Sequence, residues 1–317
     1  MKILFVSRHI PYILEQVGRF VSDQRNSLLK IDNLEVILFP IKGKGVMSYL
    51  KFIFILRRYL KEHKDIDIVH AHGGHCGLIC NFQKLKPVIT SYHGSDIHSK
   101  GLLLKLSQIS MHFSAFNIFV SKELYDLSLY KRNNYIVQPC GVSLDLIKPI
   151  EFITAREYLG WDINKIYVLF GGAYSRAIKN STLAKEAVAK LNDVELIELK
   201  GYLREEISIL MSACNCLLVT SFRESGPLVV KEAMACNCPI VTTDVGDVRW
   251  VMGDTEGCYI TAYDAKECAD KISQALRFSK KNIKTKGRNR IIEIGLSNDT
   301  VANDIYEVYK TIYKGNI

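Results

Sequence analysis

Two glutamates separated by eight positions stand out in the C-terminal half of the sequence. Glu224 falls in a loop after the strand-like run Cys216–Thr220, and Glu232 lies about one turn into a predicted helix. Both carboxylates can therefore face one cleft, where each can accept a pair of hydrogen bonds from vicinal hydroxyl groups. This spacing suits one glutamate to a sugar and the other to a nucleotide ribose, although solvated loop and helix residues show it as well.

The loop after the first glutamate leads into the start of a helix. Ser225, Gly226, Pro227 and Leu228 follow Glu224, and proline is favoured in a first helical turn because it has no N–H to leave unpaired. Free N–H groups and the positive end of the helix dipole attract anions. Because Gly226 leaves room for close approach, this segment is predicted to bind a phosphate group.

Two cations follow a glycine turn near the start of the same half. The strand-like run Tyr167–Gly171 leads into Gly172, and Arg176 and Lys179 lie three residues apart just beyond it. Two cations beside a tight turn suit the two charged groups of a diphosphate. A basic turn that caps a helix would have the same composition.

Histidines gather at two places in the N-terminal half. The run HAHGGHC spans residues 70–76 and includes Gly73, and the segment TSYHGSD spans residues 90–96 and ends a predicted strand. His70 and His72 share one face of an extended strand, so zinc binding by His70, His72 and His75 is one interpretation of the first run.

Strand-like and helix-like segments alternate along the chain, which favours parallel sheets with crossover helices. The expected strands are Ile3–Ser7, Leu34–Phe39, Ile66–His70, Pro87–Ser91, Asn117–Ser121, Tyr167–Gly171, Glu195–Leu199, Cys216–Thr220 and Pro239–Thr242. The expected helices are Gly18–Lys30, Tyr49–His63, Asn180–Leu191, Glu205–Ala213, Gly226–Cys236, Ala265–Phe278 and Val301–Tyr313. Prolines near residues 139 and 149 disfavour a continued helix. We therefore predict two doubly wound α/β domains, 1–149 and 150–317, with the last helix a candidate to pack back on the first.

Charge is distributed unevenly between the predicted domains. Residues 1–149 hold 20 Lys/Arg and 11 Asp/Glu, a formal charge of +9, whereas residues 150–317 hold 22 of each. A basic half attracts lipid headgroups, phosphates or nucleic acid, or is simply a soluble basic surface. The nine cysteines show no disulfide-framework spacing and predict reduced thiols. No export signal or apolar run of about 18 residues is recognisable, so the chain is expected in the cytoplasm.

These segments together resemble the family 4 glycosyltransferases of the GT-B fold. The resemblance rests on ESGPLVVKE (224–232), AMACNCPIV (233–241) and TDVGD (243–247), and on HGSD (93–96) in the first half. It is nearest to the subgroup that builds bacterial surface polysaccharides, such as teichuronic-acid-type enzymes. It implies two Rossmann-like domains facing across a cleft, and retaining transfer of a hexosyl-type sugar from a nucleoside-diphosphate sugar, with UDP favoured over GDP.

The resemblance also implies roles for individual residues. It assigns Arg176 and Lys179 to the donor diphosphate and His93 to the transferred sugar, with Asp96 in a polar supporting role. The expected catalytic residues are His93, Glu224, Arg176 and Lys179; the donor-binding residues are Glu232, Ser225, Gly226, Pro227, Leu228, Gly172 and Gly201; and the acceptor-side residues are Gln24, Gly73 and Asp96.

The expected chemistry needs neither a metal nor a cofactor. The family pattern explains HAHGGHC as a strand end and glycine turn lining the acceptor side, and no Asp-x-Asp element suited to a divalent ion stands out. The resemblance implies front-face attack without a protein nucleophile, so that the protein acts by positioning and by stabilising the departing diphosphate. The first loop, RHIPYILEQVG (8–18), lacks the Gly-Gly of many relatives, which leaves the acceptor contacts open.

The expected partners are a nucleotide sugar, a lipid-linked saccharide acceptor and an anionic membrane surface, but no nucleic acid. The predicted helix near Met47–Lys64 combines aromatic and basic residues, as interfacial helices do, so the protein is expected to be peripheral on the inner face of the cell membrane. A GT-B nucleotide-sugar epimerase and a non-enzymatic basic membrane-associated protein are the alternatives. A Rossmann dehydrogenase is excluded because no G-x-G-x-x-G follows the first strand.

Overall fold

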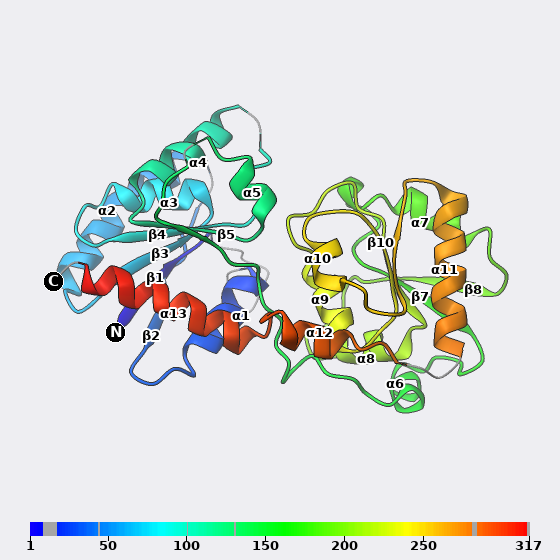
Figure 1. The fold of residues 1–317 in the computed structure, drawn as a ribbon. Helices are drawn as coiled ribbons and strands as arrows, with labels where there is room; N and C mark the ends of the chain where they lie inside the picture. The colour runs from blue at the N-terminus through cyan, green and yellow to red at the C-terminus, as the bar shows by residue number, and fades with distance from the viewer. Residues whose placement is uncertain (9–17, 44, 100, 130, 281–283, 316–317) are drawn as a thin grey trace. The chain divides into compact units, whose positions relative to one another are not determined.

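A computed structural model describes residues 1–8, 18–43, 45–99, 101–129, 131–280 and 284–315 of the chain. Two compact units make up the fold (Figure 1). Unit 1 comprises Met1–Cys140 together with Asn298–Ile317, and unit 2 comprises Gly141–Ser297.

Unit 1 is built on a six-stranded parallel sheet in the order β2-β1-β3-β4-β5-β6. Its strands are β1 (Lys2–Val6), β2 (Glu35–Leu38), β3 (Ile68–His72), β4 (Val88–Tyr92), β5 (Phe116–Phe119) and β6 (Tyr135–Val137). Its helices are α1 (Arg19–Leu28), α2 (Val46–Glu62), α3 (Gly74–Asn81), α4 (Leu102–Phe113), α5 (Lys122–Asp126) and α13 (Asn298–Lys314).

Alternation along the strands divides the sheet of unit 1 into two different faces. Val69 and Ala71 of β3 pack with Phe52 and Leu56 of α2 in one apolar cluster. The intervening histidines of β3 point the other way, where they meet Phe5 of β1 and Tyr309 of α13. One face is therefore a conventional apolar core, and the other carries buried polar rings.

Unit 2 is built on a five-stranded parallel sheet in the order β11-β10-β9-β7-β8. Its strands are β7 (Ile166–Phe170), β8 (Val194–Glu198), β9 (Cys216–Val219), β10 (Ile240–Thr243) and β11 (Cys258–Thr261). Its helices are α6 (Phe152–Leu159), the 3-10 turn η1 (Ala177–Lys179), α7 (Ser181–Val188), α8 (Glu206–Ala213), α9 (Leu228–Ala235), α10 (Val248–Met252), α11 (Ala265–Lys280) and α12 (Gly287–Glu293).

The two sheets share one connection pattern, because in each the second strand lies outside the first and the third lies on its other side. The chain therefore reverses its direction of winding between β1 and β3 and again between β7 and β9. Ligands of doubly wound sheets bind at such switch points, beyond the carboxyl ends of the strands. The prediction of two doubly wound α/β domains is confirmed.

The boundary between the units falls after Cys140, rather than at residue 149 as the prolines suggested. Residues 141–149 are tied to unit 2 by backbone groups. Arg288 donates to the carbonyls of Leu144 (2.7 Å) and Ile147 (2.8 Å), and the N–H of Lys148 donates to Ser208 Oγ (3.2 Å). Proline marks an irregular segment, but these hydrogen bonds decide which unit holds it.

The last helix, α13, belongs to unit 1, so the second domain does not extend to residue 317. Tyr309 of α13 is fully buried, and its hydroxyl lies 2.6 Å from Nδ1 of His70 in β3. α13 also packs against α1. The return of the last helix to the N-terminal domain is thus a property of the fold.

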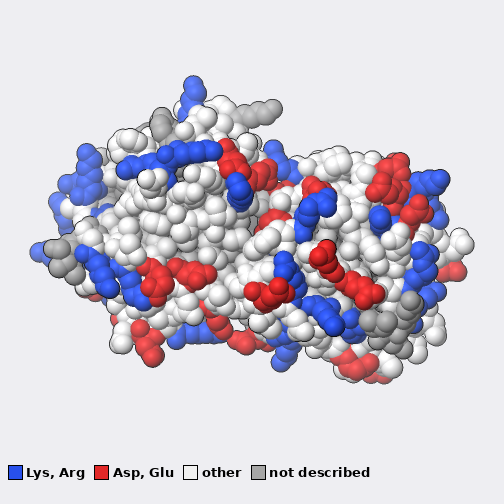
Figure 2. Space-filling model, in the orientation of Figure 1, with Lys and Arg blue, Asp and Glu red and all other residues white. Residues whose placement is uncertain are grey.

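None of the helices in the described ranges is both long and apolar enough to cross a membrane. On the face drawn in Figure 2, Lys and Arg side chains are interspersed with Asp and Glu rather than gathered into one field.

Candidate functional site

The carboxyl end of β7 passes directly into a glycine turn that is covered by a lysine side chain. A Cβ added at Gly172 would lie 3.0 Å from the Cγ and Cδ atoms of Lys179, which follows in η1. Only a residue without a side chain lets the lysine stem lie so close. Lys179 is 9% exposed, and its position across the turn is fixed by packing.

Lys179 and Glu224 meet at the switch point between β7 and β9. Lys179 Nζ donates to Glu224 Oε1 at 2.6 Å, and Ser221 Oγ donates to the same oxygen at 2.7 Å. Thr220 Oγ1 in turn donates to the carbonyl of Lys179 at 3.0 Å. The structure thus brings together two of the predicted catalytic residues, which are far apart in sequence.

The second glutamate of the motif is buried and paired with a cation that the sequence did not single out. Glu232 on α9 is 6% exposed, and Arg204 Nη1 forms an ion pair with its Oε1. Arg204 lies in the turn between β8 and α8, which also contains Gly201, exposed and with a φ of +84°. Gly201 was predicted to bind the donor, but its neighbour Arg204 makes the contact with the glutamate.

The helix α9 begins at Leu228, with Pro227 as its N-cap and no side chain capping its first turn. A Cβ added at Gly226 would lie 2.9 Å from Oδ2 of Asp247, in the turn after β10. Asp247 Oδ2 also pairs with Lys231 Nζ at 2.9 Å, and Lys231 is 1% exposed. The loop that includes Ser225 and Gly226 is therefore backed by a buried ion pair that sequence reasoning missed.

The two cations predicted to hold a diphosphate differ in their environment. Lys179 is buried and paired with a carboxylate, whereas Arg176 lies just before η1 and is exposed. The guanidinium of Arg176 is therefore accessible to an anion. The ammonium group of Lys179 would have to leave the carboxylate of Glu224 in order to bind a phosphate.

In unit 1, Asp96 ties together the loops that follow β3 and β4. Its Oδ2 accepts from the N–H of Gly74 (2.9 Å), and its Oδ1 accepts from those of Gly94 (2.9 Å) and Ile97 (3.2 Å). Gly73, with a φ of +100°, supplies the turn that brings Gly74 into reach. Asp96 therefore holds the two loops together through backbone donors.

His93 lies within this loop as a partly buried ring. Its Nε2 is 3.2 Å from Nδ1 of His72, and its ring centroid lies 4.2 Å from that of Phe20 of α1, with the two rings tilted by 42°. Burial lowers the pKa of His93 to about 4 and that of His70 to about 3. Both imidazoles are therefore neutral at neutral pH.

The remaining acceptor-side predictions concern α1 and the loop before it. Gln24 is half-buried on α1. Residues 9–17 of the first loop lie outside the described residues.

Comparison with known proteins identifies both halves of the chain. Residues 19–146 match the model of Glycosyltransferase Family 4, and residues 164–294 match that of Glycosyl transferases group 1. The chain is a glycosyltransferase with the GT-B fold. It is 25% identical over 298 residues to an uncharacterized glycosyltransferase of Methanocaldococcus jannaschii, which covers 80% of this chain and 82% of the relative.

Solved structures of this fold superpose on nearly the whole glycosyltransferase. Sucrose-phosphate synthase from Thermosynechococcus elongatus aligns with a TM-score of 0.84 at 17% identity, over 99% of each chain. Anabaena HepE in complex with UDP and glucose aligns with a TM-score of 0.78 at 16% identity, over 98% of this chain and 100% of that one. At this identity the likeness establishes the fold.

His70, one of the three histidines considered for zinc, has hydroxyl partners on both ring nitrogens. These partners are Tyr309 and Ser91, and all nine cysteines are free. Across the part of the chain that the structure describes, no group of three or more His, Cys, Asp or Glu side chains is arranged to hold a metal ion.

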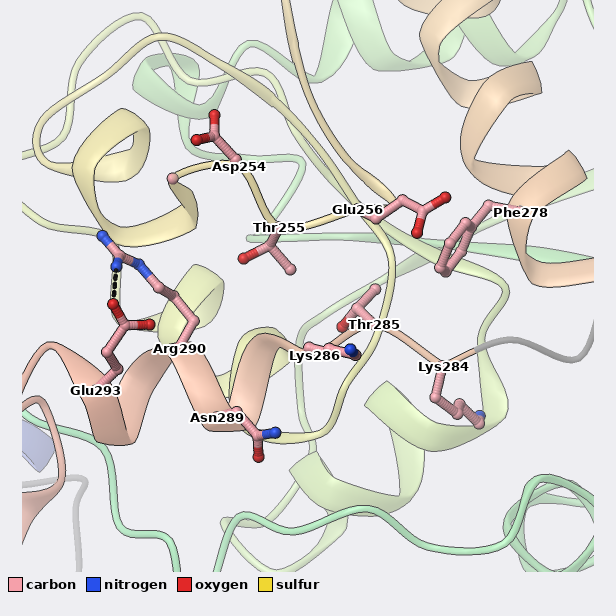
Figure 3. Close-up of a pocket in the computed structure, with 11 residues that line it drawn as sticks. Asp254, Thr255, Glu256, Phe278, Lys284, Thr285, Lys286, Asn289, Arg290 and Glu293 are labelled. Carbon is pink, nitrogen blue, oxygen red and sulfur yellow. Dashed lines mark hydrogen bonds and ion pairs between the residues drawn. The ribbon is translucent and has the colours of Figure 1, made fainter.

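A separate hollow of about 500 Å³ lies between the loop that precedes β11 and the helix α12, at the amino end of the unit 2 sheet (Figure 3). Arg290 of α12 reaches back to Glu293 (3.0 Å) and to the carbonyl of Trp250 (3.1 Å) on one side of it. Asp254 and Glu256 lie on the loop that precedes β11. Because it lies at the opposite end of the strands from Glu224, this hollow is not part of the site built around the glutamates.

Proposed function

We propose that this glycosyltransferase moves a hexosyl-type sugar, with retention of configuration, from a nucleoside-diphosphate sugar to a lipid-linked saccharide acceptor. The reaction would use no metal or cofactor, would favour UDP over GDP, and would serve bacterial surface polysaccharide synthesis. The observation that carries the proposal is the Lys179–Glu224 pair at the switch point of unit 2, beside the uncapped start of α9.

The donor diphosphate would be held by three kinds of positive potential. The start of α9 at Gly226, Pro227 and Leu228 offers backbone N–H groups, the exposed Arg176 offers a guanidinium, and Lys179 offers an ammonium group behind the glycine turn. A dianionic diphosphate would draw Lys179 away from Glu224, because charge-assisted hydrogen bonds to phosphate are strong. Donor binding would thereby release the Glu224 carboxylate for the sugar.

The two glutamates would divide the hydroxyl groups of the donor between them. Both contacts that hold Glu224 fall on Oε1, so its second oxygen can accept a hydrogen bond from a sugar hydroxyl. Glu232, oriented by Arg204, would accept from the ribose. The complex of Anabaena HepE with UDP and glucose supports such a donor for this fold.

Transfer would proceed by front-face attack, in which the leaving diphosphate helps to take the acceptor proton. The protein would lower the barrier by orienting the donor and by stabilising the charge on the departing diphosphate through Arg176, Lys179 and the start of α9. His93 would contact the transferred sugar.

The acceptor is proposed to be lipid-linked because of the surface of α2. Val46, Met47, Phe54 and Ile55 are more than half exposed on this helix. Beside them lies a groove of about 650 Å³ that is lined by apolar residues and by two lysines: Phe39, Pro40, Lys42, Gly43, Met47, Ser48, Lys51, Phe52 and Ile55. Apolar side chains with flanking cations suit the surface of an anionic membrane, so the enzyme would act at the inner face of the cell membrane.

A panel of nucleotide sugars, read by thermal shift and by donor hydrolysis, tests the central proposal. We expect a UDP-sugar to raise the melting temperature and to be hydrolysed slowly when no acceptor is present. If no nucleoside-diphosphate sugar binds, the proposal fails. Conversion of the donor to its epimer in the same assay would instead support a nucleotide-sugar epimerase.

Sedimentation with liposomes tests the membrane proposal separately. Vesicles that contain anionic lipid should pull down the full chain at low salt, and Phe54→Glu should weaken binding because it places a charge in the apolar surface. Phe113→Glu, on the exposed part of α4, is the matched control. No binding at low salt would contradict the membrane role without affecting the donor site.

A further inference from the structure

The buried face of unit 1 carries a stack of three histidine rings with an unequal distribution of partners. His70 and His72 stack at a centroid distance of 4.5 Å, and His72 and His93 stack at 5.4 Å. Both ring nitrogens of His70 have hydroxyl partners, Tyr309 (2.6 Å) and Ser91 (2.8 Å). His72, which is 4% exposed, contacts His93 through Nδ1, but no described residue lies within hydrogen-bond distance of its buried Nε2.

The contact between His72 and His93 can hold its single proton in two ways. Burial holds the pKa of both rings well below the ordinary value of 6.5, so each ring is neutral and carries one N–H. If His93 donated through Nε2, His72 would have to carry its own proton on Nε2. That arrangement would bury an N–H with no acceptor among the described residues.

The alternative arrangement avoids an orphaned donor. His72 then donates from Nδ1 to Nε2 of His93, and only a bare nitrogen lone pair of His72 remains unpaired. Buried N–H groups without a partner are rarer in proteins than under-satisfied acceptors. The backbone N–H of His93 also donates to Oδ2 of Asp96 at 3.4 Å, which anchors the loop that carries the ring.

We infer that His72 is a positioning residue that fixes the tautomer of His93, so that His93 presents an Nδ1–H donor and no free lone pair. His93 then donates a hydrogen bond to an oxygen of its ligand and cannot act as a general base. This reading of the ligand as a sugar oxygen rests on the proposed function, whereas the tautomer is a property of the protein alone.

Long-range ¹H–¹⁵N correlation spectra of the full chain, labelled with ¹⁵N-histidine, test the tautomer without any ligand. The signals are assigned by comparison with His72→Phe, His93→Gln and His70→Phe. We expect both His72 and His93 to be protonated on Nδ1 at neutral pH. A proton on Nε2 of His93 would overturn the inference, whatever the outcome of the nucleotide-sugar panel.

Variants of His72 test the consequence for transfer. His72→Phe keeps the ring volume but removes the donor, so the tautomers of His93 should mix and kcat should fall about three- to tenfold with little change in the donor KM. His72→Asn keeps an N–H near the position of Nδ1 and should restore most of kcat.

His70→Phe is the matched control, because it removes two hydrogen-bonding nitrogens from the same stack without removing a contact to His93. It should lower the melting temperature but leave the tautomer of His93 and kcat unchanged. An unchanged His93 spectrum in His72→Phe, or an equal loss of kcat in His70→Phe, would show that His72 has only a structural role.

Discussion

The two units carry different kinds of side chain at the carboxyl ends of their parallel sheets. At the carboxyl ends of the unit 2 strands, carboxylates that are buried or partly buried face cations in the pairs Lys179–Glu224, Arg204–Glu232 and Lys231–Asp247. At the carboxyl ends of β3 and β4 in unit 1, neutral His70 contacts two hydroxyls, and one carboxylate, Asp96, accepts from backbone N–H groups. Unit 2 therefore presents paired charges, and unit 1 presents neutral rings, on which the proposed division between a charged donor and a sugar depends.

Loss of Lys179 from unit 2 should have the largest effect on transfer from the donor. Lys179→Ala removes a cation from the diphosphate and leaves Glu224 buried without its partner, so kcat/KM for the donor should fall by about 10²- to 10³-fold. Lys190→Ala, which removes an exposed lysine just beyond α7, is the control. Equal kcat/KM in the two variants would show that the pair in unit 2 does not bind the donor.

Loss of Glu232 should weaken donor binding while leaving the fold intact. Glu232→Ala removes a hydrogen-bonded carboxylate and leaves Arg204 without it, so the donor Kd should rise by about ten- to a hundredfold. Calorimetric titration with the donor checks this, and circular dichroism checks the fold. Glu205→Ala, an exposed change in the same turn as Arg204, should bind normally. An unchanged Kd in Glu232→Ala would count against the ribose role.

Acid should affect unit 1 through His70, His72 and His93, because burial holds these three rings in the neutral form. The pKa of His93 falls from 6.5 to about 4 on folding, so between these values the unfolded chain binds the extra proton. The contribution of His93 to the free energy of unfolding should therefore be independent of pH above pH 6.5 and should fall by about 1.4 kcal/mol per pH unit as the pH decreases toward 4. Urea unfolding between pH 7 and pH 4 should show a shallower pH dependence in His93→Gln; equal slopes would contradict the neutral, buried ring.

Loss of Arg176 should have the smallest of these effects. The side chain is exposed, and exposed charges contribute less than buried ones because water screens them. Arg176→Ala should lower kcat/KM for the donor by about three- to tenfold. Added salt should reduce the difference in kcat/KM between this variant and the wild type. A loss as large as that of Lys179→Ala would mean that the exposed cation, and not the buried pair, binds the diphosphate.

The sequence predicted the sheets, and it singled out half of the charged residues that meet in unit 2, because these signals are local. The apolar runs marked nine of the eleven strands that the described residues form, with ends within two residues of those observed. The Glu-x7-Glu motif singled out Glu224 and Glu232, and the glycine turn singled out Lys179. These residues adjoin strand ends, so the strand order alone brings them near one another.

The partners of those residues were missed because they depend on how neighbouring loops pack. Arg204 lies in the turn after the edge strand β8, and Asp247 lies after β10. Neither has a local pattern that indicates its contact with α9. The contact between His72 and His93 likewise depends on the pairing of β3 with β4.

Some elements were missed because packing overrides weak local preference. Helix α3 contains glycines in the sequence GHCGLICN, which favours a loop on propensity alone. A Cβ added at Gly77 would lie 2.3 Å from Thr90 Oγ1 and 2.5 Å from Ser110 Oγ. The helix forms because its small residues let it pack closely against β4 and α4.

The placement of α13 makes unit 2 an insertion within unit 1. The chain leaves unit 1 after Cys140 and returns at Asn298, so β1 and α13 both belong to the same unit. A mechanical force applied between β1 and α13 would load unit 1 directly and reach unit 2 only after unit 1 had opened. For expression of separate parts, residues 141–297 form a continuous segment, whereas unit 1 needs a short linker from residue 140 to residue 298 to retain the Tyr309–His70 contact.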